Sequence, residues 1–225
     1  MSSYDLSRRL AIEALGTALL LATVVGSGIM GERLAGGNTA IVLLANAIAT
    51  GAALFTLITM FAPISGAHFN PVVTMIEAIS GRLSWRHAAA YVAVQFAAAL
   101  VGVLLAHLMF ELQPLQLSLH VRSGAAQWLS EFVATFGLLS VILFNRKSPV
   151  PTVAASVACY ITAAYWFTAS TSFANPAVTF ARSLTDTFSG IRLVDAPLFM
   201  VAQVIGGTVA YAVFRGIIHE NDRRL

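Results

Sequence analysis

Two short segments of this chain decide its fold: AHFNPVVTMIEA, residues 67–78, and SFANPAVTFARS, residues 172–183. Each places the pair Asn-Pro inside a long apolar stretch, at residues 70–71 and again at residues 175–176. Proline in a helix interior breaks the helix, but Asn is a favoured N-cap and Pro a favoured first helical residue. Both segments therefore predict a helix that begins within an apolar region.

The surroundings of both pairs are those of a membrane protein. Of the 225 residues, 58% are hydrophobic and only 10% are charged, against about 25% charged in soluble domains. Residues 34–76 and 148–181 contain no Asp, Glu, Lys or Arg, and each stretch exceeds the roughly 20 residues that one crossing needs. The net charge of +3 is too small to indicate a nucleic-acid partner. The sequence predicts an integral protein of the lipid bilayer.

Hydropathy predicts six membrane-spanning helices and two shorter ones. The six spans are expected at about residues 11–30, 40–61, 87–110, 127–145, 150–168 and 197–215. The Asn-Pro segments lie between the second and third spans and between the fifth and sixth. They predict half-length helices over residues 71–79 and about 176–187, each followed by a Ser-Gly pair. At 1.5 Å per residue, each covers roughly half of a hydrocarbon core of about 30 Å.

The first span begins like a secretory signal peptide, with a basic pair followed by an apolar run over residues 8–28. Glu13 interrupts that run, and no small-x-small cleavage site follows at the expected place. We therefore interpret this segment as a retained membrane span.

The two halves of the chain repeat each other in the same order. The recurring pairs are Glu13 and Glu131, Thr17 and Thr135, Asn70 and Asn175, Thr74 and Thr179, and Gln95 and Gln203. Because each repeat contains three spans, the second copy must lie upside down relative to the first. We predict an all-α membrane protein with an inverted 3+3 repeat, over about residues 10–111 and 127–216 of a single domain, 1–225.

Lys and Arg are distributed unequally over the predicted loops. With the N-terminus inside, nine lie on the cytoplasmic side and four on the outer side. The nine are Arg8, Arg9, Arg82, Arg86, Arg146, Lys147, Arg215, Arg223 and Arg224, and the four are Arg33, Arg122, Arg182 and Arg192. This asymmetry follows the positive-inside rule. We expect a multi-pass protein of the cell (inner) membrane with both termini cytoplasmic.

The inversion explains why an apolar chain carries Asn-Pro twice. The two half-helices enter from opposite faces, so their N-termini meet near the bilayer midplane. Each N-terminus carries about half a positive charge and unpaired amide donors. A cation would lose its hydration shell there and face two repelling dipoles, whereas water or a neutral hydroxylated solute would find donors in the amides of Asn70 and Asn175. The residues predict a passage for neutral solutes that discourages cations.

With these motifs the chain resembles the aquaporin and glycerol-facilitator (major intrinsic protein) family. The resemblance covers nearly the whole chain, and its motif residues are Asn70, Pro71, Val72, Asn175, Pro176 and Ala177. It implies an aquaporin-like fold of six spans and two half-helices around one pore per subunit, assembled as a homotetramer.

The resemblance also implies roles for residues around the motifs. Glu13 and Glu131 are expected to brace the loops before the half-helices, a role we favour over a proton relay. Backbone carbonyls of Gly66, Ala67 and His68 are expected to line one side of the pore. For the His68 side chain we favour a structurally satisfied imidazole over a pH sensor.

The family carries a second filter near the outer mouth, whose positions we transfer by spacing from the two Asn residues. They are Thr50, Ala163, Ser172 and Val178, with Val178 in the place of the family's usual arginine. Four small uncharged side chains imply a wide aperture for water and for glycerol, urea or metalloid hydroxides. The variant Asn-Pro-Ala-Val-Thr also resembles that of bacterial members associated with arsenic resistance, which implies arsenite and methylated arsenicals as solutes.

Arg182 follows Val178 by four residues and so lies one turn nearer the outer mouth. Two roles are open to it. It can replace part of the missing filter charge, or it can complement the helix C-terminal dipole or pair with Asp186. We favour the second role.

Two other functions are kept as alternatives. Inverted repeats with broken helices also occur in coupled secondary transporters, but both helix starts here carry Asn rather than the Asp or Glu of an ion site. The other alternative is a structural membrane protein with a closed pore. The sequence shows no nucleophile–base–acid set, cofactor motif or metal-ligand spacing, so we expect neither an enzyme nor a cofactor or metal site.

Overall fold

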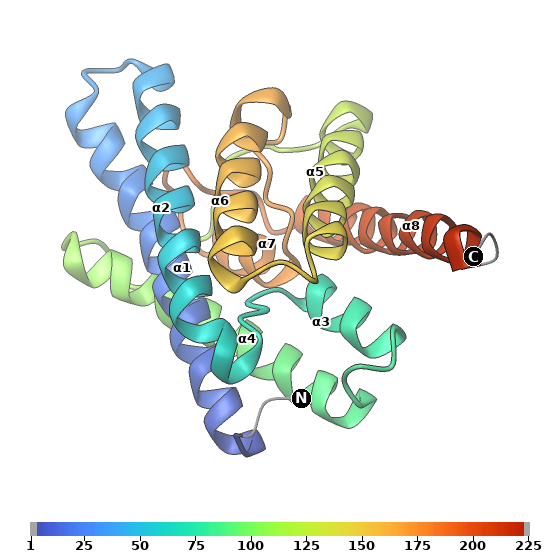
Figure 1. Ribbon diagram of the computed structural model, residues 1–225. Helices are drawn as coiled ribbons and strands as arrows, with labels where there is room; N and C mark the ends of the chain where they lie inside the picture. Colours follow the sequence, from blue (N-terminus) through green and yellow to red (C-terminus); the bar gives the residue numbers. More distant parts are fainter. Residues whose placement is uncertain (1–3, 223–225) are drawn as a thin grey trace.

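The computed structural model describes residues 4–222, which contain eight helices joined by loops (Figure 1). Their bounds are α1 Leu6–Leu34, α2 Thr39–Ser65, α3 Pro71–Ile79, α4 Trp85–Met109, α5 Ala125–Phe144, α6 Val150–Phe167, α7 Pro176–Arg182 and α8 Ala196–Asp222. Six are long and apolar enough to cross a membrane, and α3 and α7 are the half-helices. The predicted all-α fold is confirmed. Arg223 and Arg224, counted above as cytoplasmic cations, lie outside the described residues.

The two half-helices begin where the Asn-Pro pairs predict. Asn70 Oδ1 accepts a hydrogen bond from Val72 N at 2.9 Å, and Asn175 Oδ1 accepts one from Ala177 N at 3.0 Å. In both cases the proline is the first helical residue, where no backbone donor is lost. The N-caps therefore act locally, as the sequence indicates.

The second half-helix ends earlier than predicted. α7 stops at Arg182, so the expected range of 176–187 is wrong at its C-terminal end. Long-range backbone bonds occupy the carbonyls of the chain that follows: Ser118 N donates to Ser183 O at 3.0 Å and Gln116 N to Leu184 O at 3.2 Å. The loop between α4 and α5 thus holds these residues in a non-helical path.

The helices pack with the symmetry of an inverted repeat. α1 contacts α2 and α4, and in the same way α5 contacts α6 and α8. α3 and α7 each contact the last helix of both repeats, and the two halves meet through α2 against α6 and α3 against α7. In Figure 1, α1, α2, α6 and α5 stand side by side. Apart from the minor contact between α1 and α7, every packed pair has its counterpart in the other half, as a 3+3 inverted repeat requires.

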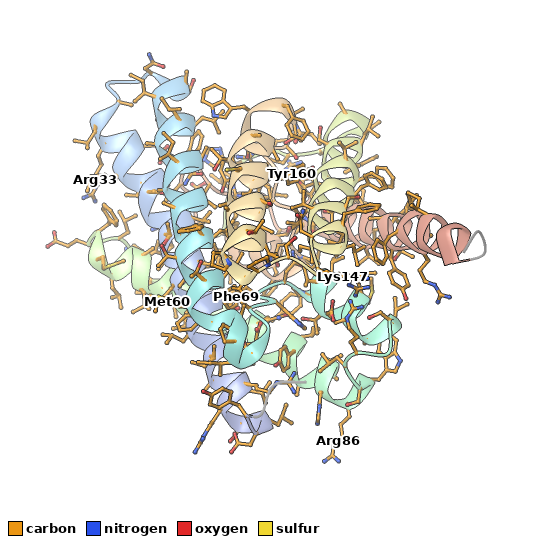
Figure 2. All side chains as sticks on the ribbon, viewed as in Figure 1. Arg33, Met60, Phe69, Arg86, Lys147 and Tyr160 are labelled. Carbon is orange, nitrogen blue, oxygen red and sulfur yellow. The ribbon has the colours of Figure 1, made fainter. Side chains whose placement is uncertain are left out.

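The ends and the outer surface of the bundle differ in character. Figure 2 shows Arg33 and Arg86 at opposite ends, which agrees with their assignment to opposite sides of the membrane. Met60 lies on the outer surface and is 55% exposed, whereas Phe69 lies in the interior and is 2% exposed. Large apolar side chains cover the outer faces of the helices, among them Leu15, Leu44, Ile48, Leu105, Leu129 and Val201. Such a surface fits lipid or another subunit.

Candidate functional site

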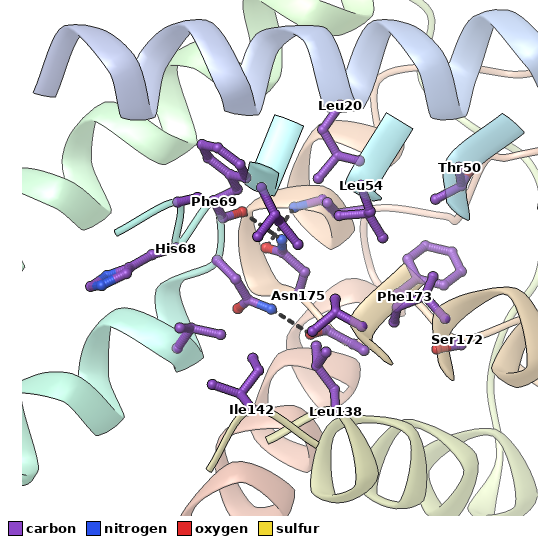
Figure 3. Close-up of a pocket in the computed structure, with 18 of the residues that line it drawn as sticks. Leu20, Thr50, Leu54, His68, Phe69, Leu138, Ile142, Ser172, Phe173 and Asn175 are labelled. Atoms are coloured by element: carbon purple, nitrogen blue, oxygen red, sulfur yellow. Dashed lines mark hydrogen bonds between the residues drawn. The ribbon is translucent and has the colours of Figure 1, made fainter. Parts of the chain in front are cut away.

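The starts of α3 and α7 meet at a cavity of about 120 Å³, large enough for several water molecules. Each capping Asn donates to the loop of the other repeat: Asn70 Nδ2 to Ala174 O and Asn175 Nδ2 to Phe69 O, both at 2.8 Å (Figure 3). Both Asn residues line the cavity. Because a side-chain amide carries two N–H donors, each Asn has a second donor available there.

The loops that lead into the half-helices share one unusual backbone conformation. Ala67 and Phe69 have φ of 49° and 48°, and Ser172 and Ala174 have φ of 51° and 48°. In both loops these residues lie three and one positions before the capping Asn. A left-handed conformation costs a non-glycine residue of the order of 1–3 kcal/mol. Two left-handed non-glycine residues in each of the two loops therefore require strong support from the surrounding structure.

Two fully buried carboxylates supply that support. Glu13 accepts hydrogen bonds from His68 N at 2.9 Å and Phe69 N at 2.8 Å. In the other repeat, Glu131 accepts from Phe173 N at 2.9 Å and Ala174 N at 2.8 Å. The loop amides thus turn toward the carboxylates, while Gly66, Ala67 and His68 line the cavity.

Each carboxylate is held by a glutamine of its own repeat. Gln95 Nε2 donates to Glu13 Oε2 at 2.9 Å, and Gln203 Nε2 donates to Glu131 Oε2 at 2.6 Å. Ser65 Oγ adds another bond to Glu13, at 2.7 Å. Hydrogen bonds to a charged acceptor are about twice as strong as neutral ones. Neutral donors therefore stabilise both charges, and neither Glu is among the described residues that line the cavity.

The predicted filter position Ala163 is wrong. Ala163 is exposed on the outer face of α6, whereas Val157, Ile161 and Tyr165 line the cavity. These three residues are spaced by four and share one helix face, and Ala163 is turned from Ile161 by about 200°. Counting back twelve residues from Asn175 thus reaches an exposed position of α6. Tyr165 occupies the place expected for Ala163.

The other three predicted filter residues do line the cavity. Thr50 and Ser172 lie at one end and His68 at the other, with Asn175 between them (Figure 3). Thr50 Oγ1 lies 3.2 Å from the hydroxyl of Tyr165. The expectation that only small side chains form this end is therefore wrong. Within the described residues, the buried Ser172 Oγ has no hydrogen-bond partner.

Arg182 lines the same cavity as Val178. It is only 1% exposed, its Nε donates to the carbonyl of Ser189, and its guanidinium carbon lies 3.4 Å from the ring centroid of Phe173. Asp186 instead accepts a bond from the backbone of Leu119, at 2.9 Å. The pairing of Arg182 with Asp186 is thus wrong, whereas the position of Arg182 in the last turn of α7 agrees with the other part of the favoured role, which is to complement the helix C-terminal dipole.

Arg122 is a structural residue near Arg182 and Phe173 that sequence reasoning did not single out. It lies in the loop between α4 and α5 and donates to Gly190 O at 2.7 Å, Phe188 O at 3.2 Å and Ser170 O at 3.3 Å. Burial lowers the pKa of Arg122, opposed by the attraction of Glu131. Arg122 thus ties together the loops on both sides of α7. Nothing in its sequence neighbourhood marks it, because its partners are backbone carbonyls far along the chain.

At the His68 end, the first cavity adjoins a second cavity of about 400 Å³. Gly66 and His68 line both cavities, so they stand where the two meet. His68 Nδ1 lies 3.0 Å from Thr74 Oγ1, which agrees with a satisfied imidazole. Arg9 and the ion pair between Glu77 and Arg82 lie at this second cavity. The two Asn residues thus lie between this polar second cavity and the end that holds Thr50 and Ser172.

Comparisons with known proteins agree with this geometry. The sequence profile of the family described as "Major intrinsic protein" matches residues 1–149 and 144–224. The chain is 56% identical over 218 residues to "Aquaglyceroporin AqpS" of Rhizobium meliloti (strain 1021), which covers 97% of this chain and 93% of that protein.

More distant proteins show the same relationship. The chain is 34% identical to "Aquaporin NIP1-4" of Oryza sativa subsp. japonica, over 63% of this chain and 51% of the plant protein. Among solved structures, an aquaglyceroporin from Plasmodium falciparum superposes with a TM-score of 0.74, covering 95% of this chain and 97% of the other at 18% identity. At that identity the likeness concerns the fold alone.

Proposed function

This chain belongs to the major intrinsic protein family, and from that premise we propose that it is a passive channel for water and small neutral solutes. The observation that carries the proposal is the crossed pair of hydrogen bonds between Asn70 and Asn175 and the opposite loops. This pair puts two helix N-termini and two side-chain amides on one cavity. Such a site offers donors to a hydroxylated solute and repels cations.

The charges around the cavity favour a passive channel over a coupled transporter. A coupled transporter needs an ion site near the midplane. Within the described residues, no carboxylate lines the cavity, because Glu13 and Glu131 accept hydrogen bonds from the loops instead. We assign these two residues to bracing, and the carbonyls of Gly66, Ala67 and His68 to contact with the passing solute.

The outer end suggests which solutes pass. Thr50, Ser172 and Val178 line the cavity beside Tyr165, and the first three are small, uncharged side chains. We propose glycerol and urea as solutes, and the relative from Rhizobium meliloti is itself named an aquaglyceroporin. Neutral metalloid hydroxides such as arsenite, and their methylated forms, belong to the same proposal, because arsenite is an uncharged triol of similar size to glycerol.

Stopped-flow light scattering on proteoliposomes tests these solutes in parallel. Vesicles with the purified protein are compared with empty vesicles for water, glycerol, urea and arsenite. We expect each rate to exceed that of empty vesicles and to rise linearly with the gradient. Passage of water with exclusion of the other three would contradict the solute assignment. Saturable uptake that needs a second ion gradient would indicate the coupled transporter, and no permeation at all would indicate a closed-pore structural protein.

A further inference from the structure

The outer end of the cavity contains one arginine although Val178 stands where the family's usual arginine is expected. We infer that Arg182 supplies the fixed positive charge of the outer filter, from the next turn of α7. The inference rests on the proposed function and adds to it the residue that excludes cations. Arg182 and Val178 are four residues apart and line the same cavity, so the charge is shifted by about 6 Å along the helix axis.

The guanidinium of Arg182 is held in a defined position. Its Nε donates to Ser189 O, and its plane lies against the ring of Phe173. Phe173 is fixed in turn by an edge contact with Phe199, with 5.3 Å between ring centroids. A planar guanidinium that is stacked and bonded in this way loses little further freedom when it binds a solute. Arg182 thus has the rigidity that a filter residue needs.

Two nitrogens of Arg182 are available to the passage. Within the described residues Arg182 donates a hydrogen bond only through Nε, so the protein does not engage either Nη atom in a hydrogen bond. Because Arg182 lines the cavity, these donors lie where a passing solute or water can reach them. The unpartnered hydroxyl of Ser172 lies at the same end. The two Nη atoms thus offer donors to a neutral hydroxylated molecule.

No acid among the described residues forms an ion pair with Arg182, although the buried carboxylate of Glu131 attracts its charge from farther away. The described residues contain three ion pairs, and Arg182 takes part in none of them. The nearest cation, Arg122, is also directed at Phe173, with its guanidinium carbon 5.2 Å from the ring centroid. A positive field in a narrow passage with apolar walls is only weakly screened. A cation that reaches this end meets repulsion before it reaches the two Asn residues.

This arrangement separates selection by size from selection by charge. At the level of Val178 the wall is small and apolar, which leaves width for a polyol. One turn further out, Arg182 keeps the charge that excludes hydronium and metal cations. A single arginine at position 178 would impose both limits at one place.

The test measures cation leak and solute flux in the same proteoliposomes. We compare the parent protein with Arg182→Gln, which removes the charge, and Arg182→Lys, which keeps it. Proton leak is followed with an entrapped pH-sensitive dye under a potassium and valinomycin potential, and glycerol flux by stopped-flow scattering. We expect Arg182→Gln to raise the proton leak by about tenfold or more and Arg182→Lys to stay near the parent. Arg192→Gln, an outer arginine away from the cavity, is the matched control and should change neither rate.

A rescue variant separates charge from packing. In Arg182→Gln combined with Val178→Arg, the charge returns one turn inward, while the contacts to Ser189 and Phe173 stay lost. We expect the proton leak to fall back toward the parent value and glycerol flux to fall below it. If Arg182→Gln does not raise the leak, or the double variant does not lower it again, Arg182 is not the filter charge. If the parent protein conducts no neutral solute, the proposed function itself fails, which is a different result.

Discussion

Glu13 shows, at the scale of a single residue, how a buried charge shapes the passage. It lies at zero exposure within a membrane span, where an ionised group is costly, yet four neutral donors satisfy it. Two of those donors are amides of the loop that contains left-handed Ala67 and Phe69. The carboxylate therefore stabilises a backbone that the loop residues do not favour, and that backbone places the loop at the cavity.

We predict that Glu13→Gln destabilises the protein and slows water permeation. Glu13 uses both oxygens as acceptors, so the NH₂ of Gln faces two donors whichever way it points. Each orphaned donor costs about 1–3 kcal/mol of unfolding free energy. Thermal unfolding in detergent, followed by intrinsic fluorescence, measures the loss. Glu111→Gln, at an exposed position, is the control; an equal melting temperature for both variants would contradict the bracing role.

At the scale of elements, two glycines set the distance between paired helices. A Cβ on Gly102 of α4 would lie 2.3 Å from Ala18 O of α1, and a Cβ on Gly206 of α8 would lie 2.4 Å from Phe132 O of α5. In both pairs the obstacle is backbone, which cannot rotate away. Each repeat therefore contains one helix pair whose backbones touch through a glycine, as small-residue packing in membranes allows.

Gly102→Ala and Gly206→Ala are expected to lower the melting temperature, because each forces two helix backbones apart. The matched control is Gly216→Ala in α8, where an added Cβ meets nothing within 4 Å. There the higher helix propensity of Ala is worth about 1 kcal/mol, so stability should be unchanged or slightly higher. Thermal unfolding of the three variants in one detergent measures the effect. A loss for Gly216→Ala as large as for the other two would show that helix spacing is not the cause.

At the scale of the whole molecule, the apolar outer surface belongs to a protein that lies in lipid. We propose a homotetramer, with both termini on the cytoplasmic side. Both half-helices and the cavity between them come from one chain. Association is therefore not needed to build the cavity, and in the proposed tetramer it would cover apolar helix faces.

The tetramer has a measurable mass. Four chains of 23.8 kDa give a protein mass of about 95 kDa. Size-exclusion chromatography with light scattering, corrected for bound detergent, reads this mass directly. A protein mass near that of one or two chains in several mild detergents would contradict the tetramer. The liposome measurements would stand in that case, because they depend on the single chain.

The sequence alone determined the spans, the starts of α3 and α7, the inverted repeat and the paired Glu and Gln residues. Hydropathy, N-caps and residue pairs at matching positions act over short stretches of chain, so they can be read locally. Tertiary structure alone decided that α7 ends at Arg182, that Tyr165 and not Ala163 faces the cavity, and that Arg182 lies over Phe173. α6 is apolar on all sides, so its pattern cannot tell the pore face from the lipid face. The loops around α7 are placed by backbone bonds to distant segments, which no local pattern records.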